Sequence, residues 1–475
     1  MRSQPSETGP VPGAGERRRE RWADFHRAFV EFLTVPSIVV AAFVLLAILM
    51  LHLDSGQSGK PAILGDLFSD AEATRDFLSV VANGIITVTS ITFSLLLLAV
   101  QQGANDLTSV IFDQFLRRRT NQIFFGFFTG LALYSLIVLT SVSPDHQPAL
   151  GAAAAGFMTL VALCMLIFLI YSTVNQMRPV VIIKAIHDHT LIARSQQLTL
   201  LKQTYWPPRL EARNTIKVAA ASSGFLTGIS LEDINQALAG QNLEVIILAS
   251  IGDFVAFGDE VAEIRSDGGV VEKSLADAVR RAVMFESQRD LDADPAFGIE
   301  QLITIAWTSI STAKSDPEPG LLTIWSLRDL LARWLQANDG FGEAGRKASV
   351  AGGFIAYHDN LPGEIMRGLE SLAVAASESL QHQCTAEIYR TFARSYHRLP
   401  AELQARAANI LERTVAALGD HVLTTSLDDA LTAIIVVLER EGNERTAGLI
   451  RDAQQQLAKS IGQLNSRSTR VKAAR

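Results

Sequence analysis

The chain has 475 residues, of which 48% are hydrophobic and 19% are charged, and its net charge is −7. This acidic balance gives no global signal for nucleic-acid binding, although both terminal tails are locally basic. Its two cysteines, Cys164 and Cys384, lie far apart in the sequence, which excludes a disulfide framework and a cysteine-based zinc site.

Four long apolar runs occupy the N-terminal part of the chain, at residues 32–53, 77–100, 123–142 and 150–171. None of these runs contains a Lys, Arg, Asp or Glu. A helix that crosses a membrane needs about 20 mostly apolar residues. The first run lacks a clear small-residue cleavage site, which favours a retained anchor over a signal peptide. We therefore predict a transmembrane domain of four helices over residues 31–175, after a basic tail at residues 1–30.

Lys and Arg are distributed unequally around these runs. They are concentrated before the first run, between the second and third, and after the fourth, with Arg17, Arg18, Arg19, Arg117, Arg118, Arg119, Arg178 and Lys184. The loop at residues 141–149 has neither residue type, and the loop at residues 54–76 is mainly acidic. Positively charged flanks resist translocation. The pattern predicts a multi-pass membrane protein with both termini in the cytoplasm.

The second run carries polar side chains along one helical face. The five residues recur at spacings of 4, 3, 4 and 7 and are Asn83, Thr87, Ser90, Ser94 and Gln101. A stripe turned toward lipid would leave side-chain amides without partners, so it should face protein or water. Two interpretations stay open: hydrogen bonds to other helices within or between subunits, and the lining of a water-filled path in an oligomer.

The third and fourth runs carry small residues at their beginnings. Gly126 and Gly130 lie four residues apart in the third run, and the fourth opens with Gly151, four alanines and Gly156. Small residues at such spacings let helix backbones approach closely. We predict close helix packing at these four glycines, with a gating hinge as the alternative.

The rest of the chain predicts a cytoplasmic α+β region. Residues 180–201 form a juxtamembrane helix within a segment at 176–210, which two prolines terminate. Short β-type stretches at 216–226, 244–249, 254–256 and 260–264 predict a small β domain over residues 211–270, with a helix at 231–238. Residues 271–459 show apolar faces at helical spacing, which indicates a helical bundle or array, and a basic tail follows at 460–475.

No motif assembles a catalytic, cofactor or metal site. Residues 340–345 fit the Gly-x-Gly-x-x-Gly pattern but follow a predicted helix instead of a strand, so we predict a loop without dinucleotide binding. His187 and His189 point to different faces of their helix and are predicted to be solvated. The acidic cluster Asp290, Asp292 and Asp294 is predicted to cap the helix after it or to be solvated, with attraction of a divalent cation as the alternative. We expect no cofactor, no metal and no enzyme activity.

Several short motifs resemble a bacterial family of predicted membrane proteins, domain of unknown function 2254. In chain order they are residues 91–95 with Gln101, Phe115 and Leu116 with the arginines after them, Gln122 with Gly126, Gly224, Gly252-Asp253, Gly258, Asp294, residues 297–302 and Asp316-Pro317. The resemblance implies the same plan of N-terminal spans and a soluble C-terminal domain and, because the family is bacterial, a location in the bacterial inner membrane. It implies no activity.

The leading functional hypothesis is a homo-oligomer in the lipid bilayer. Its polar second span would line a channel or solute conduit, and the cytoplasmic domain would assemble or regulate it. The alternative is a non-conducting membrane-anchored scaffold or sensor that recruits a cytoplasmic protein partner. Neither hypothesis involves nucleic acid.

Overall fold

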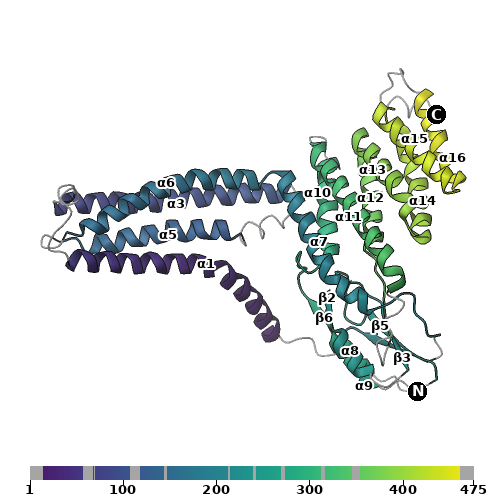
Figure 1. The fold of residues 1–475 in the computed structure, drawn as a ribbon, viewed down its shortest axis with the longest axis horizontal. Coiled ribbons are helices and arrows are strands. Elements are labelled where there is room, and N and C mark those ends of the chain that lie inside the picture. Colours follow the sequence, from purple (N-terminus) through teal and green to yellow (C-terminus); the bar gives the residue numbers. More distant parts are fainter. Residues whose placement is uncertain are drawn as a thin grey trace. The chain divides into compact units, whose positions relative to one another are not determined.

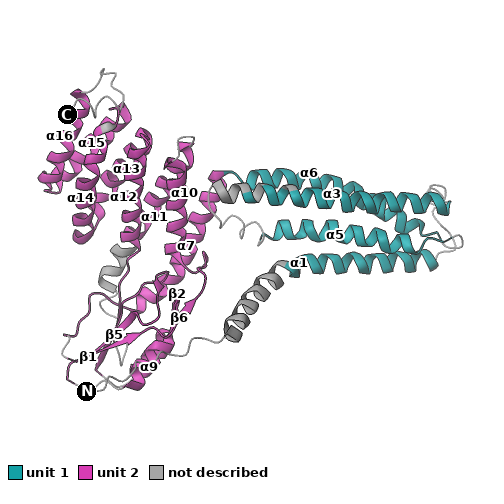
Figure 2. Ribbon diagram, turned by 180° about the vertical axis from the view of Figure 1, so that it is seen from behind, with its two compact units in different colours: residues 1–178 teal, residues 179–475 magenta. Residues whose placement is uncertain are grey.

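The computed structural model describes residues 14–56, 68, 70–106, 118–143, 147–211, 214–238, 242–268, 273–311, 316–344 and 354–459 (Figure 1). The chain divides into two compact units, unit 1 at residues 1–178 and unit 2 at residues 179–475 (Figure 2). The predicted basic tail at 460–475 and the first 13 residues of the N-terminal tail lie outside the described part of the chain.

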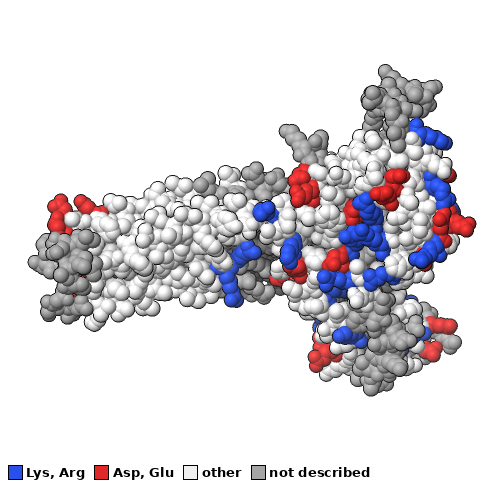
Figure 3. Space-filling view, turned by 45° about the horizontal axis from the view of Figure 1, so that its top comes forward, with Lys and Arg blue, Asp and Glu red and all other residues white. Residues whose placement is uncertain are grey.

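Unit 1 consists of long helices that lie side by side in Figure 1. Their bounds are α1 (Ala14–Gly56), α3 (Ala71–Asp106), α5 (Arg119–Thr140) and α6 (Ala149–Gln176). Each contains a stretch long and apolar enough to cross a membrane: Leu33–Ser55, Ala71–Leu98, Arg119–Thr140 and Ala149–Gln176. In the view of Figure 3, the described surface of unit 1 shows charged side chains only near its two ends. The four predicted apolar helices are therefore confirmed.

Helix α5 forms the centre of unit 1, because it packs more extensively against α1, α3 and α6 than those three helices pack against one another. Half of the most apolar stretch of α5 is buried, compared with 24% in α3 and 17% in each of α1 and α6. The side chains of Leu131, Tyr134 and Val138 on α5 are fully buried. The core of unit 1 is thus built around one helix.

Unit 2 begins with α7 (Pro179–Gln203), and its described residues form two β-sheets. The four-stranded sheet has the order β1-β5-β3-β7, and the three-stranded sheet has the order β4-β2-β6. The strands are β1 (Asn214–Ala219), β2 (Gly224–Ile229), β3 (Leu243–Ile247), β4 (Phe254–Val255), β5 (Glu260–Ser266), β6 (Val283–Glu286) and β7 (Phe354–Tyr357). Strand β3 is buried along its whole length, and it pairs antiparallel with β5 and parallel with β7. Helices α8 (Leu231–Leu238) and α9 (Lys273–Ala282) contribute side chains to the same core.

The sheets differ from the predicted β domain in three places. The single stretch predicted at 216–226 is two strands, β1 and β2, which belong to different sheets. Strands β6 and β7 come from the region predicted to be helical. Strand β6 forms because it pairs with the edge of β2, and β7 forms because it pairs with the edge of β3. Pairing between segments so far apart in the sequence gives no periodic pattern of apolar residues in either segment. The β structure therefore extends beyond residue 270.

The remaining helices of unit 2 confirm its mostly helical character. They are α7 (Pro179–Gln203), α10 (Pro295–Ser311), α11 (Pro317–Ala344), α12 (Leu361–Glu378), α13 (His382–Ser395), α14 (Ala401–Val415), α15 (Thr425–Arg440) and α16 (Glu444–Lys459), with short 3-10 turns η1 (Tyr396–Arg398) and η2 (Ala416–Asp420). Helix α7, the predicted juxtamembrane helix, packs against α10 and α11. The predicted loop at 340–345 is wrong for residues 340–344, which belong to α11, because the glycines there do not interrupt the backbone hydrogen bonds of the helix. Gly345 lies outside the described residues.

Candidate functional site

The polar stripe lies on α3 and faces away from the other helices of unit 1. Its five residues are all exposed in the single chain: Asn83, Thr87, Ser90, Ser94 and Gln101. At about 100° of rotation per residue, they fall within about 60° of the helix circumference. The buried residues Leu78, Ile85 and Leu96 of α3 lie on the opposite side. The stripe therefore makes no contact that buries it within the chain's own helix bundle.

Hydrogen bonds within α3 satisfy some of these side chains. The Thr87 hydroxyl donates to the Asn83 carbonyl at 2.7 Å, and the Ser94 hydroxyl donates to the Ser90 carbonyl at 3.0 Å. A hydroxyl that donates to a carbonyl of its own helix needs no further acceptor for its proton. The Asn83 amide donates to Ser79 Oγ at 3.3 Å, its one hydrogen bond in the described part of the chain. Since a primary amide has two donors and an acceptor, Asn83 has capacity left for a partner.

Apolar side chains border the stripe on both sides. Val80, Ile91 and Leu98 are 71%, 56% and 60% exposed along one edge, and Ile86 and Phe93 are exposed along the other. An uncharged polar strip between two apolar edges suits contact between subunits, with the apolar edges packing and the strip meeting water or other polar groups. The site is thus a surface of α3 that the described part of the chain does not cover.

The predicted packing glycines of α5 lie against α1. A Cβ added to Gly126 would be 2.8 Å from Val39 Cβ, and one added to Gly130 would be 2.6 Å from Phe43 Cδ2. Both distances are shorter than side-chain packing permits. The absence of a side chain at these positions therefore sets how closely α1 and α5 approach.

The predicted glycines of α6 lie against two other helices. A Cβ on Gly151 would be 2.9 Å from Val138 Cγ1 on α5, and one on Gly156 would be 3.2 Å from Phe77 Cζ on α3. Each predicted glycine thus faces a neighbouring helix of unit 1, whereas the polar stripe does not.

The beginning of α6 is stabilised by a carboxylate from α1. Pro148 occupies the N-cap position and makes no side-chain cap hydrogen bond. Asp54 instead accepts hydrogen bonds from the backbone N–H groups of Leu150 at 3.0 Å and Gly151 at 2.9 Å. Free N–H groups and the positive end of the dipole favour an anion at a helix N-terminus. This contact was not predicted. The feature of the sequence that could have indicated it is an Asp at the end of one apolar run together with the absence of a capping side chain at the start of another.

Unit 2 contains a cavity of about 460 Å³ where the turn at residues 250–253 meets α10 and α12. We call it the turn cavity. Gly252 has a φ of +95°, and a Cβ there would lie 2.6 Å from Arg289 Nη2. Only glycine therefore lets the Arg289 guanidinium lie against this turn. Asp253 closes the turn by accepting a hydrogen bond from Ser250 N at 2.7 Å.

Arg289 forms one wall of the turn cavity. Its Nε donates to Asp294 Oδ2 at 2.6 Å, and its Nη1 pairs with Glu300. Asp294 also accepts a hydrogen bond from Phe297 N at 3.1 Å, which caps α10 as predicted for this acidic cluster. The guanidinium lies 5.0 Å from the centre of the Phe297 ring. The motifs that carry the family resemblance at Gly252-Asp253, Asp294 and 297–302 thus meet at one place, which their separation in the sequence did not reveal.

The floor of the turn cavity is a hydrogen-bonded network. Tyr357 Oη accepts a hydrogen bond from Ile251 N at 3.1 Å, and Gln197 Oε1 accepts one from Arg194 Nη1 at 2.8 Å. Arg194 also pairs with Asp359 through both terminal nitrogens. Burial raises the pKa of Tyr357 to about 12, so its hydroxyl stays protonated. Tyr357 and Gln197 therefore give the cavity an uncharged, hydrogen-bonded floor.

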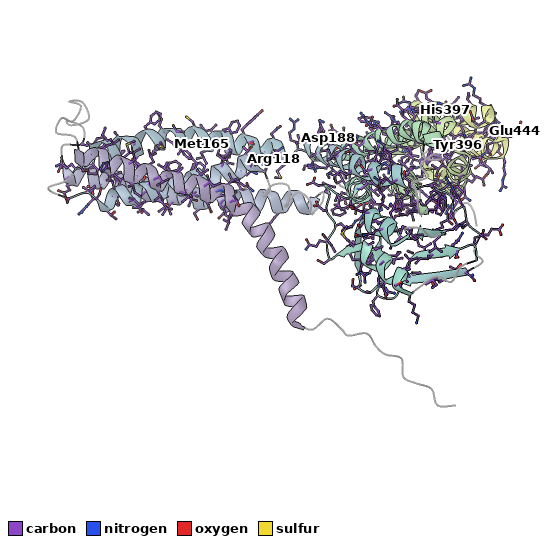
Figure 4. All side chains as sticks on the ribbon, turned by 60° about the horizontal axis from the view of Figure 1, so that its bottom comes forward. Arg118, Met165, Asp188, Tyr396, His397 and Glu444 are labelled. Carbon is purple, nitrogen blue, oxygen red and sulfur yellow. The ribbon has the colours of Figure 1, made fainter. Side chains whose placement is uncertain are left out.

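Among the described residues, no three His, Cys, Asp or Glu side chains lie close enough to hold a metal ion. The predicted solvation is wrong for His187, whose side chain is only 14% exposed, whereas His189 is 39% exposed. Both histidines contact a carboxylate. His187 Nε2 lies 2.9 Å from Asp329 Oδ2, and His189 Nδ1 lies 2.5 Å from Asp292 Oδ1. Asp188 between them, labelled in Figure 4, pairs with Lys184 at 2.7 Å. The two acidic partners come from distant segments, which helical spacing alone does not predict.

Comparison with known proteins identifies relatives of this chain. A family model described as predicted membrane protein (DUF2254) matches residues 30–380. An uncharacterized protein of Mycobacterium bovis and one of Mycobacterium tuberculosis are each 24% identical over 265 residues, which is 53% of this chain and 51% of each relative. The chain thus spans about half the length of the curated relatives it matches. No solved structure matches it.

Proposed function

This chain belongs to the DUF2254 family of predicted membrane proteins, and we propose that it forms a homo-oligomer whose α3 helices line a path for ions or small solutes. The observation that carries the proposal is the exposed position of the stripe from Asn83 to Gln101, opposite the buried side of α3. In a bilayer this face meets lipid, another subunit or water. Lipid offers an amide no partner, so another subunit or water suits Asn83.

The stripe supports a conduit because it is narrow and uncharged. When several copies of α3 meet around an axis, the polar strips face the axis and the apolar edges pack against neighbouring subunits. Such a lining passes solutes without a fixed charge filter.

The charge distribution supports a bacterial inner-membrane location with both termini in the cytoplasm. Asp54 at the end of α1 contacts the start of α6, and Arg75 at the start of α3 donates to the Val142 carbonyl at 3.2 Å. These contacts bring one end of all four helices together. Arg118, labelled in Figure 4, lies at the start of α5 and therefore at the other end of unit 1. By the positive-inside rule, that second end faces the cytoplasm.

A flux experiment tests the conduit. Full-length protein in liposomes of phosphatidylethanolamine and phosphatidylglycerol is expected to release trapped potassium faster than empty vesicles do. Asn83→Leu combined with Ser90→Leu is expected to reduce this release at least about tenfold, because the lining becomes apolar and dewets. The matched control is Ile86→Leu combined with Ile91→Leu, which changes the apolar edges of the same helix. Wild-type vesicles that release no more potassium than empty ones would contradict the conduit.

A cross-linking experiment tests the subunit arrangement. Ser90→Cys in a Cys164→Ser background is expected to form an intermolecular disulfide in membranes after mild oxidation. The native Cys164 supplies the control, because it is exposed on α6. Cross-linking through Cys164 without cross-linking at position 90 would place α6, and not α3, between subunits.

The second candidate function is a non-conducting sensor or scaffold, which the turn cavity favours. A cavity of about 460 Å³ with paired charges and a hydrogen-bonded floor has the size of small-molecule sites in general. A monomeric protein without flux, from which mild detergent recovers a stoichiometric soluble partner, would support this function over the conduit.

A further inference from the structure

A second hollow in unit 2 lies between α11 and the end of α13 with η1. It encloses about 250 Å³, and three arginines line it: Arg328, Arg394 and Arg398. We call it the arginine groove. Arg394 and Arg398 are four residues apart and so share one side of the chain as it leaves α13. Trp325 forms the rim from α11 and is 43% exposed.

The acidic side chains near the arginine groove are already engaged. Asp329 pairs with Arg333 at 2.6 Å and with His187 at 2.9 Å. Glu387 is shared between Arg328 at 2.6 Å and Arg390 at 3.2 Å. No further carboxylate lies among the described residues 325–336 and 382–398.

The charges of these two segments therefore do not cancel. They contain five guanidinium groups, on Arg328, Arg333, Arg390, Arg394 and Arg398, against the two carboxylates. Three positive charges remain, in a chain whose net charge is −7. Within the described part of the chain, neither Arg394 nor Arg398 forms an ion pair, and Arg398 Nη2 reaches only the Ala332 carbonyl at 3.5 Å.

The backbone that carries Arg394 and Arg398 is held in place. Tyr396 lies between the two arginines in the sequence and is buried. It is labelled in Figure 4 beside His397. Its hydroxyl accepts a hydrogen bond from Asn443 Nδ2 at 3.2 Å, and its carbonyl accepts one from Gln404 Nε2 at 3.2 Å. These bonds fix η1 against α14 and the start of α16. The two arginines are thus presented from a rigid turn, which lowers the entropy lost when a ligand binds.

We propose that the arginine groove binds a phosphate-bearing small molecule. Guanidinium forks match the geometry of phosphate oxygens, and charge-assisted hydrogen bonds of this type are strong. The volume of about 250 Å³ accommodates the phosphate end of such a molecule. The exposed indole of Trp325 offers a flat surface on which a planar ring can stack. This site does not depend on the oligomer or the conduit proposed above.

Calorimetry on the full-length protein in dodecyl maltoside, a detergent without phosphate, tests the site. ADP and inorganic pyrophosphate are expected to bind and adenosine is not, and binding should weaken as sodium chloride rises because salt screens the arginines. Absence of binding by both ADP and pyrophosphate would overturn the proposal. Binding of dispersed phosphatidylglycerol without binding of ADP would assign the groove to a lipid headgroup and would also overturn it.

Two paired variants locate the binding. Arg394→Gln with Arg398→Gln is expected to weaken ADP and pyrophosphate at least tenfold, with unchanged thermal unfolding because both side chains are exposed. Arg281→Gln with Arg440→Gln removes the same charge from exposed positions elsewhere in unit 2 and should leave both affinities unchanged. An equal loss of affinity in the two double variants would show a non-specific charge effect and would overturn the proposed binding at the arginine groove.

One further variant tests whether the ligand stacks on the indole ring of Trp325. Trp325→Ala is expected to weaken ADP several-fold while pyrophosphate binding stays the same. An equal loss for both probes would overturn the stacking role of Trp325.

Discussion

Helices α5 and α3 have nearly the same mean hydropathy over their spans, 2.1 and 1.9, yet they use their polar residues in opposite ways. The polar residues Asn121, Gln122 and Ser135 of α5 are buried inside unit 1. The polar stripe of α3 faces outward. Hydropathy alone does not separate the two helices. The two helices differ in the side on which their polar groups lie. Helix α5 turns them into the core of unit 1 and serves as its framework, whereas α3 exposes them on the surface of the unit.

Gly130→Leu should have the largest effect on the stability of unit 1, because it disrupts the packing of α5 against α1. A side chain at this position would overlap the Phe43 ring on α1, and forced overpacking of this kind costs about 3 kcal/mol or more. Unfolding in a titration with sodium dodecyl sulfate measures the change. The matched control is Gly84→Leu on α3, where nothing lies within 4 Å of an added Cβ. Equal destabilisation by both changes would remove the distinction between α5 and α3.

Asp54→Asn should have the next largest effect. The amide keeps one acceptor for the N–H groups of Leu150 and Gly151 but loses the second acceptor and the charge that the α6 dipole favours. The expected loss of stability is about 1–2 kcal/mol in the same titration. Asp76→Asn, at an exposed position of α3, is the control. If Asp54→Asn were neutral, the contact would not hold α6 to α1.

Tyr134→Phe probes the framework with a smaller change. The buried Tyr134 hydroxyl donates to the Gly151 carbonyl at 3.0 Å, and its removal should cost about 1 kcal/mol. Tyr171→Phe on α6 should be silent, because Tyr171 is 70% exposed. A larger cost at position 171 would show that the exposed surface of α6 is covered in the assembled protein.

Features set by composition over a single segment were predictable from the sequence. The four spans follow from the length of apolar runs, and the helix at Leu231–Leu238 was predicted with its observed bounds. The order of short motifs identified the family, which the match over residues 30–380 confirms. Helical spacing also showed that Asn83 and Gln101 share one face. It could not show whether that face lies inside or outside unit 1, because this depends on which neighbours α3 packs against.

Features that join distant segments were not predictable. Asp54 and Leu150 are 96 residues apart. Strand β7 pairs with β3 from more than 100 residues away, and its four residues are too few to show a period. The turn cavity needs the Gly252 turn, Arg289 and α12 together. Each of these features depends on tertiary packing, for which one sequence contains no local pattern.

Asn83→Leu combined with Ser90→Leu should have the smallest effect on unit 1 itself. Both side chains are exposed, so the stability of the detergent-solubilised monomer should change by less than about 0.5 kcal/mol. The same change should leave the protein oligomeric in light scattering after size exclusion, because the apolar edges of α3, and not the polar stripe, are proposed to pack between subunits. Strong destabilisation of the monomer would mean that the stripe is packed within the chain, and α3 would then belong to the framework together with α5.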